Sequence, residues 1–92
     1  MTEAHSLVTV EFYGIPRQRA GRAELTVAAV TTAEVLAAVE QARPGLSDLR
    51  RPDGRLAPHY LLSVEGRQFV TDLSEVLQPG ARLLLLSADA GG

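Results

Sequence analysis

The stretch RLLLLSADAGG, from Arg82 to Gly92, decides how the rest of the sequence is interpreted. Four consecutive leucines suit a strand in the middle of a sheet, because successive side chains of a strand point to opposite faces. The leucines are followed by four small or polar residues and by two glycines, which have no side chain to pack. We expect a strand over residues 82–86 and a flexible C-terminal tail over residues 87–92.

A second apolar segment, LVTVEFY at residues 7–13, has the alternating pattern of a strand with one buried face. Residues 14–22 contain two glycines and a proline and are predicted to form a loop. The alternation returns at residues 23–29, where Leu25 and Val27 point inward. We therefore expect two strands of a hairpin with a long connection.

The hydrophobic period changes from two to about 3.6 residues after these strands, which predicts a helix. Thr31 or Thr32 can provide its N-cap, and Glu34 places an acidic side chain in the first turn. The helix is expected to end at Pro44-Gly45, because proline and glycine both interrupt helical structure.

The remaining predicted elements are short. Residues 60–64 form a third strand, residues 65–67 a tight reversal and residues 68–70 a fourth strand. Residues 72–77 could form one helical turn, and Pro79-Gly80 predicts the turn that leads into the leucine strand.

The expected order is strand, strand, helix, and then three strands. A single helix covering one face of a mixed sheet is the simplest packing for this order. Because the first and last strands are both strongly apolar, we place them side by side in the centre of the sheet. The prediction is an α+β fold of the β-grasp, or ubiquitin-like, type, with four to five strands and one main helix packed on one face.

Composition limits the classes of function. Ninety-two residues, 46% of them hydrophobic and 22% charged, are typical of one soluble globular domain, which we take as residues 1–92. The formal net charge of −2 gives no general attraction to nucleic acid or to an anionic membrane. The sequence shows no secretory signal and no apolar run near the roughly 20 residues that span a bilayer. We expect a cytoplasmic protein without nucleic-acid or membrane partners.

The residue types available for chemistry argue against a stand-alone enzyme. Cysteine and lysine are both absent, which removes thiolate ligands, cysteine nucleophiles and Schiff-base amines. His5 and His59 lie far apart in sequence, so we expect no metal site. Serine elbows and phosphate-binding glycine loops are missing as well. We expect no bound cofactor.

The leucine strand raises the question of what covers its second face. Leu84 and Leu86 point away from Leu83 and Leu85, toward the face that a single helix leaves open. Either a loop shields this face, or the protein presents an apolar patch of the kind that marks a partner surface.

Arginines gather in two loops, at residues 17–22 and 50–55. They are either solvated surface charges or groups that dock an acidic partner. The candidate partner-binding residues are taken from the first strand, its loop and the last strand: Phe12, Arg17, Leu84 and Leu86.

Four segments resemble the MoaD/ThiS family of small ubiquitin-like sulfur carriers. VTVEFYGIPRQRAG (8–21) is similar to the opening of molybdopterin-synthase small subunits, where an apolar strand runs through Phe-aromatic-Gly to an arginine and then a glycine. TTAEVLAAVEQARPGL (31–46) resembles their first helix, and LLSVEGRQF (61–69) the strand, turn and strand that follow. LQPGARLLLLSADAGG (77–92) resembles the closing turn, last strand and Gly-Gly tail.

The resemblance implies that this chain is a carrier, not an enzyme, and that its chemistry takes place at the terminus. In such carriers an adenylating enzyme of the ubiquitin-activating type uses ATP to adenylate the last carboxylate. Persulfide sulfur from a sulfurtransferase or cysteine desulfurase then displaces AMP. Gly92 would become the thiocarboxylate, with Gly91, Ala90 and Asp89 as its tail. The sulfur would reach molybdopterin through a synthase large subunit or an equivalent acceptor enzyme.

The tail departs from the family pattern. Molybdopterin-synthase small subunits commonly have a proline-rich approach to Gly-Gly, whereas residues 87–90 here read SADA. Thiamine thiazole, cysteine synthesis and tRNA thiolation are therefore alternative destinations for the sulfur. A ubiquitin-like binding module or protein modifier without sulfur transfer is the alternative from another functional class, since one fold serves many functions.

Overall fold

The computed structural model describes residues 7–70 and 72–88. A helix of six residues separates the first two strands, and a longer helix precedes the last three. The elements in chain order are β1 (Leu7–Phe12), α1 (Ile15–Ala20), β2 (Glu24–Ala28), α2 (Thr32–Ala42), the short 3-10 helix η1 (Pro44–Leu46), β3 (Tyr60–Val64), β4 (Gln68–Phe69) and β5 (Arg82–Ser87).

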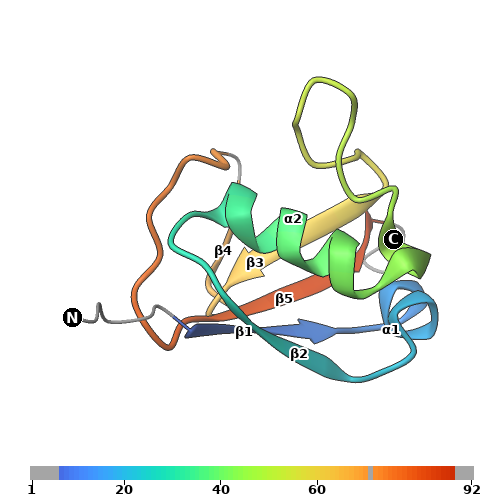
Figure 1. Ribbon diagram of the computed structural model, residues 1–92, viewed down its shortest axis with the longest axis horizontal. Coiled ribbons are helices and arrows are strands. Elements are labelled where there is room, and N and C mark those ends of the chain that lie inside the picture. The colour runs from blue at the N-terminus through green and yellow to red at the C-terminus, as the bar shows by residue number, and fades with distance from the viewer. Residues whose placement is uncertain (1–6, 71, 89–92) are drawn as a thin grey trace.

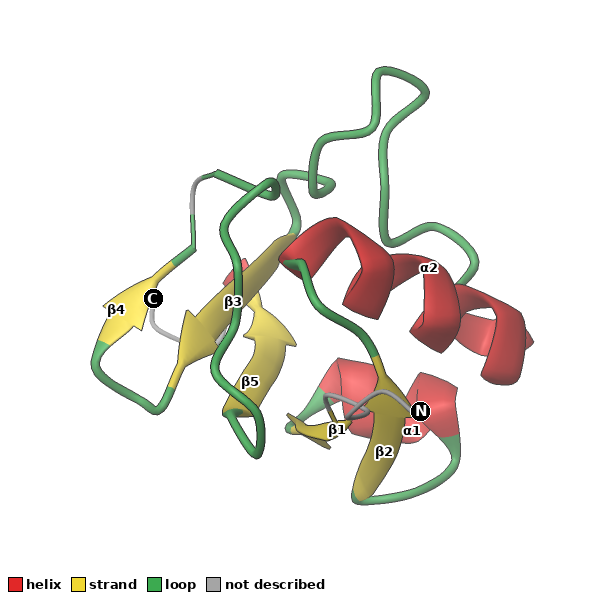
Figure 2. Ribbon diagram, turned by 60° about the vertical axis from the view of Figure 1, so that its left-hand side comes forward, coloured by secondary structure: helices red, strands yellow, loops and turns green. Residues whose placement is uncertain are grey.

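The five strands form one mixed sheet in the order β2-β1-β5-β3-β4. β1 and β5 run parallel to each other, and the other neighbouring strands are antiparallel. The first and last strands therefore lie side by side within the sheet, as predicted (Figure 1). α2 lies across one face of this sheet, which confirms the β-grasp architecture (Figure 2).

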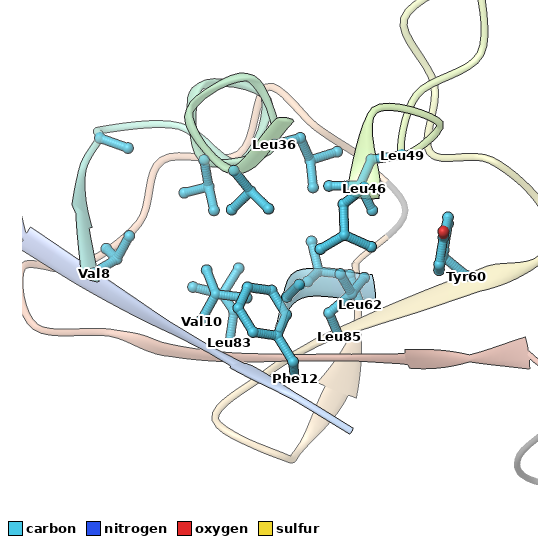
Figure 3. Packing of buried hydrophobic residues seen from close by; sticks show 14 of the residues in the cluster. Val8, Val10, Phe12, Leu36, Leu46, Leu49, Tyr60, Leu62, Leu83 and Leu85 are labelled. Carbon is cyan, nitrogen blue, oxygen red and sulfur yellow. The ribbon is translucent and has the colours of Figure 1, made fainter. Parts of the chain in front are cut away.

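The core fills the space between the sheet and α2. Val10 pairs with Leu83 and Phe12 with Leu85 across the parallel strands, so alternate residues of both strands point to the same face. Figure 3 shows these side chains directed toward the helices. The large apolar side chains that are less than 2% exposed are Phe12, Leu36, Leu46, Leu49, Leu62, Leu83, Leu85, Val8, Val10, Val35 and Val39.

α2 begins with the cap that the sequence predicts. The Glu34 backbone N–H donates to the Thr31 hydroxyl at 3.2 Å, and the Thr31 backbone N–H donates to the Glu34 carboxylate at 3.3 Å. This reciprocal pair is a capping box, which satisfies two of the free donors at a helix start.

The prediction of a loop over residues 14–22 is wrong in part, because α1 forms there. Pro16 lies in the first turn of the helix, where its missing N–H has no cost. Gly21 ends the helix in the left-handed conformation, with its N–H donating to the Arg17 carbonyl at 3.0 Å. Glycine and proline at these positions mark the two ends of a short helix as well as they mark a loop.

Gly45 allows α1 and η1 to lie against each other. A Cβ atom built on Gly45 would lie 2.1 Å from the carbonyl oxygen of Arg19, so no other residue type fits without movement of the backbone. The sequence indicates Gly45 only as a helix stop. In the structure its main role is this close approach.

Residues 72–77 do not form the predicted helical turn. The Asp72 carboxylate instead accepts bonds from the Ser74 backbone N–H at 2.9 Å and from its hydroxyl at 2.6 Å. Such local bonds from an aspartate compete with helix formation. Val76 then forms an isolated bridge with Thr31, which holds this segment against the start of α2.

The C-terminal strand is one residue longer than predicted. Ser87, taken from the sequence as the start of the tail, is the last residue of β5 and pairs with Tyr60. Ala88 is also held, because its backbone N–H donates to the His59 carbonyl at 2.9 Å. Within residues 7–70 and 72–88, no helix has the length and apolar character needed to cross a bilayer.

Candidate functional site

The face of the sheet opposite α2, here called the open face, is divided into two halves. The strand register places Leu84 beside Ser63, and Leu86 beside Leu61. Ser63 in turn pairs with Phe69, whose side chain is 58% exposed. We call Leu61, Leu84, Leu86 and Phe69 the apolar half.

The polar half consists of side chains of β1 and β2 together with Arg82 of β5, and these side chains bond to one another. Arg82 donates from Nε to Glu11 at 2.7 Å and from NH2 to Glu24 at 3.0 Å. The hydroxyls of Thr9 and Thr26 lie 3.1 Å apart on the neighbouring strands. These five residues satisfy one another, so the polar half offers a partner fewer open bonding groups than their number suggests.

Glu11 is the centre of this network. Hydrogen bonds from Tyr13 and from Arg82 lower the pKa of the Glu11 carboxyl. The hydrogen bond between Tyr13 and Glu11 also raises the pKa of the Tyr13 phenol. Both shifts favour the state in which Glu11 is charged and Tyr13 is neutral.

A groove of about 710 Å³ adjoins the apolar half. Leu61 and Phe69 line it from the sheet, and Leu56, Val70 and Leu73 line it from the flanking loops. The last three side chains are partly buried against the core, so the groove continues the apolar surface beyond the sheet edge. Such a surface suits the side chains of a protein partner.

The predicted partner-binding residues lie in different environments. Leu84 and Leu86 are half-buried on the open face, where the prediction placed them. Arg17 is exposed on α1. Phe12 is 1% exposed and packs in the core, so its selection as a partner-binding residue is corrected. An alternating strand gives no sign in sequence of which face is covered, and Phe12 lies on the covered one.

The predicted tail residues lie outside the described residues. Asp89, Ala90, Gly91 and Gly92 follow directly on Ala88 in the sequence, and the structure describes the chain up to Ala88. Their roles stay predictions. Ala88 is therefore the point from which the described part of the molecule leads to the candidate reactive terminus.

A cluster of polar side chains, which we call the tail-root cluster, lies next to Ala88. Asp48 is its centre and accepts bonds from three groups: the Tyr60 phenol at 2.7 Å, Arg19 NH1 at 2.9 Å, and His59 Nε2, which lies 3.0 Å away. Arg19 NH1 also donates to the Tyr60 oxygen at 2.8 Å. The rings of His59 and Tyr60 are in contact, with their centroids 4.2 Å apart.

Opposing effects act on the Asp48 carboxyl. Burial raises its pKa, but the hydrogen bonds from Tyr60 and His59 and the charge of Arg19 outweigh burial and leave the pKa lowered. Burial and the bond to Asp48 raise the pKa of the Tyr60 phenol. The cluster therefore holds a charged carboxylate against a neutral phenol.

No local sequence pattern predicts the tail-root cluster. In the sequence, His59 is only a possible metal ligand and Arg19 only one of several loop arginines. The residues are 11 to 41 positions apart in the pairs that bond, and only the folded topology joins them. Among the described residues, no three His, Asp or Glu side chains could hold a metal ion together.

Comparisons with known proteins identify the fold. No protein-family model matches the sequence, and no curated protein matches it. SAMP1 from Haloferax volcanii matches with a TM-score of 0.79 and 24% identity, over 94% of this chain and 99% of that one. A chain of the Amycolatopsis orientalis BexX/CysO complex matches with a TM-score of 0.76 and 25% identity, over 92% of this chain and 99% of that one.

A third solved structure is a putative molybdopterin converting factor, subunit 1, from Pyrococcus furiosus. It matches with a TM-score of 0.70 and 17% identity, over 88% of this chain and 95% of that one. The class is therefore that of small ubiquitin-like β-grasp proteins. Within this class, the chain has the fold of the MoaD/ThiS-type sulfur carriers and small modifiers, which confirms the resemblance predicted from sequence at the level of fold.

Proposed function

We propose that this chain is a sulfur carrier that works with an adenylating partner enzyme, and that Gly92 is its reactive residue. The observation that carries the proposal is the end-to-end similarity to small carriers and modifiers, together with Gly91-Gly92 a few residues beyond the central strand β5. Because β5 is the middle strand of the sheet, the start of the tail is fixed to the folded domain. Glycine at the terminus has no side chain, so the backbone can enter a narrow channel of a partner.

The Gly92 carboxylate is a poor electrophile, so the proposed chemistry first activates it. The Gly92 carboxylate attacks the α-phosphorus of ATP, pyrophosphate leaves, and an acyl-adenylate forms. The terminal sulfur of a persulfide on a sulfur-donor enzyme then attacks the acyl carbon, and AMP leaves. A thiol cleaves the S–S bond of the resulting acyl disulfide, which yields the thiocarboxylate and a new disulfide.

The apolar half of the open face is the proposed docking surface for the adenylating enzyme. Leu84 and Leu86 belong to β5, so a partner that covers them also holds the strand that leads to the terminus. Phe69, at 58% exposed, provides a large side chain for the partner to bury.

Molybdopterin is the proposed acceptor of the sulfur. Similarity to the putative molybdopterin converting factor subunit supports this choice, and an acceptor enzyme equivalent to a molybdopterin synthase large subunit would be the second partner. The similarity to CysO favours cysteine synthesis as the alternative. Assays of carrier-dependent sulfur transfer to each acceptor separate the two.

The test is to incubate the purified chain with ATP, the cognate adenylating enzyme and a persulfide donor. Intact-protein mass spectrometry should detect the acyl-adenylate, and then a mass increase equal to one oxygen-to-sulfur exchange. A chain lacking Gly92 should fail to react and should keep the thermal stability of the parent. Absence of both products in the parent chain would refute the proposal.

Protein modification is the second candidate, and the similarity to SAMP1, a small archaeal modifier protein, favours it. Here the activated Gly92 carbonyl is attacked by an amine of another protein and AMP leaves. The same incubation with cell extract would give covalent adducts that contain this chain. Adducts without thiocarboxylate would replace the carrier proposal with this one.

A further inference from the structure

We propose that the tail-root cluster positions Ala88, and that through Ala88 it sets the rate at which the partner adenylates Gly92. Asp48 is the central positioning residue, with Arg19, His59 and Tyr60 around it. The rate part of this inference rests on the proposed function. The positioning part rests on the described residues alone.

The cluster joins three separate parts of the chain. Arg19 belongs to α1, Asp48 to the segment after η1, Tyr60 is the first residue of β3, and His59 directly precedes it. The close contact of Gly45 with the Arg19 carbonyl holds α1 in the place from which Arg19 reaches Asp48. One carboxylate therefore bonds to side chains from both of the other parts.

Two contacts connect the cluster to the end of β5. The Ala88 N–H donates to the carbonyl of His59, whose side chain bonds to Asp48. Ser87, the preceding residue, pairs with Tyr60, whose phenol also bonds to Asp48. Ser87 and Ala88 thus each contact a residue whose side chain belongs to the cluster.

The buried Tyr60 phenol depends on Asp48 as its hydrogen-bond acceptor. Tyr60 is 2% exposed and packs beside the core, and in Figure 3 its oxygen points away from the sheet. An asparagine at position 48 would keep one acceptor oxygen and place an NH2 donor where the second oxygen is, so either Tyr60 or the pair Arg19 and His59 would lose its acceptor and the cluster would rearrange. Asp48, Arg19 and His59 are each about half exposed, and so changes to them are compatible with a folded protein.

The expected consequence is a change in turnover rather than in docking. The apolar half is on the opposite face of the sheet from the Tyr60 phenol, so the contacts that bind the body of the carrier stay intact. Ala88 is the anchor from which the tail reaches the partner, so releasing it widens the range of positions open to the Gly92 carboxylate and lowers the fraction of bound complexes in which it is placed for reaction. Movement of Ala88 should therefore lower kcat for adenylation while KM stays close to that of the parent.

The deciding experiment compares Asp48→Asn with Asp53→Asn. Both remove one negative charge from neighbouring parts of the same long segment, but Asp53 interacts with Arg51 and Arg55 in its own loop. Two quantities are measured for each variant: the hydrogen-exchange rate of the Ala88 amide, and kcat and KM for ATP-dependent adenylation by the cognate enzyme. His59→Ala, at an exposed side chain, is a second variant in case Asp48→Asn does not fold.

Asp48→Asn should raise the exchange rate of the Ala88 amide by about tenfold and lower kcat by about tenfold, with KM within about twofold of the parent. His59→Ala should change both in the same direction but less, Asp48→Glu should restore part of the loss, and Asp53→Asn should behave as the parent. Exchange and kcat in Asp48→Asn equal to those in Asp53→Asn would overturn the inference.

The two proposals fail in different ways. A parent chain that is never adenylated refutes the proposed function and the rate part of this inference, while the amide-exchange comparison still tests the positioning of Ala88. A parent chain that is adenylated, with an Asp48→Asn variant that is adenylated equally fast, refutes this inference and leaves the proposed function in place.

Discussion

Leu83 and Leu85 lie on one face of β5, and Leu84 and Leu86 lie on the other. The first pair is 0% and 1% exposed and packs with α2 in the core, whereas the second pair is half-buried on the open face. Four identical residues thus lie in two different environments. The alternation of a strand, not the residue type, decides which leucines pack in the core and which lie on the open face.

The largest effect should come from shortening a core leucine. Leu85→Ala leaves a cavity where neighbouring side chains cannot fully collapse, and should lower the free energy of unfolding by about 2–5 kcal/mol. Leu86→Ala, its neighbour on the open face, should lower it by about 1 kcal/mol or less. Urea denaturation of both variants measures the difference. Equal losses would mean that the two faces are equally buried in solution.

The opposite order is expected for binding. Leu84→Asp places a charge in the apolar half and should weaken binding to the adenylating enzyme at least about tenfold, because an unpaired charge would be buried in the interface. Ala28→Asp is the matched control, since Ala28 is exposed on the same face at the β2 edge. Isothermal titration with each variant tests this. Similar affinities for both would place the docking surface elsewhere.

The polar half can be changed to sharpen the same contrast. Arg82→Leu removes the bonds to Glu11 and Glu24, and because these are exposed ion pairs the free energy of unfolding should change little. It also places a third leucine on the open face of β5, next to Leu84, and so enlarges the apolar half. The variant should self-associate at concentrations where the parent is monomeric, as measured by sedimentation velocity. A monomeric variant would show that the polar half does not limit association.

The sequence predicts the strands and α2 well because each has a strong local signal. The period of two in β1 and the period of 3.6 with Thr31 and Glu34 in α2 follow from side-chain directions alone. The central pairing of β1 with β5 also follows, because both strands are apolar on alternate residues that must be buried together.

The errors come from positions where several structures share one local pattern. Gly14, Pro16 and Gly21 indicate a loop and a short helix equally well, so α1 was missed. Phe12 was placed on the partner surface because the pattern gives alternation but not the covered side. The tail-root cluster has no local signal at all, because Asp48 meets Arg19 and Tyr60 only through tertiary contacts.

The smallest effect distinguishes the two faces by pH. The folded-state pKa of Glu11 is lowered from its ordinary value of 4.5, first by the bond from Tyr13 and then by that from Arg82. A lowered folded pKa gives stability that is present above about pH 4.5 and is lost as the pH falls through the folded value. Glu11→Gln should therefore lose less stability than the parent on acidification.

Asp48 and Asp72 also have lowered pKa values, so the Glu11→Gln variant should keep part of the acid sensitivity. Leu61→Asn, a change in the apolar half that introduces no titrating group and is separated from Glu11 by β5, should keep the pH profile of the parent. Thermal unfolding midpoints from pH 7 down to pH 3 measure the profiles. Identical profiles for parent and Glu11→Gln would mean that Tyr13 and Arg82 do not hold Glu11 in solution. The polar side chains would then be free to bond to a partner.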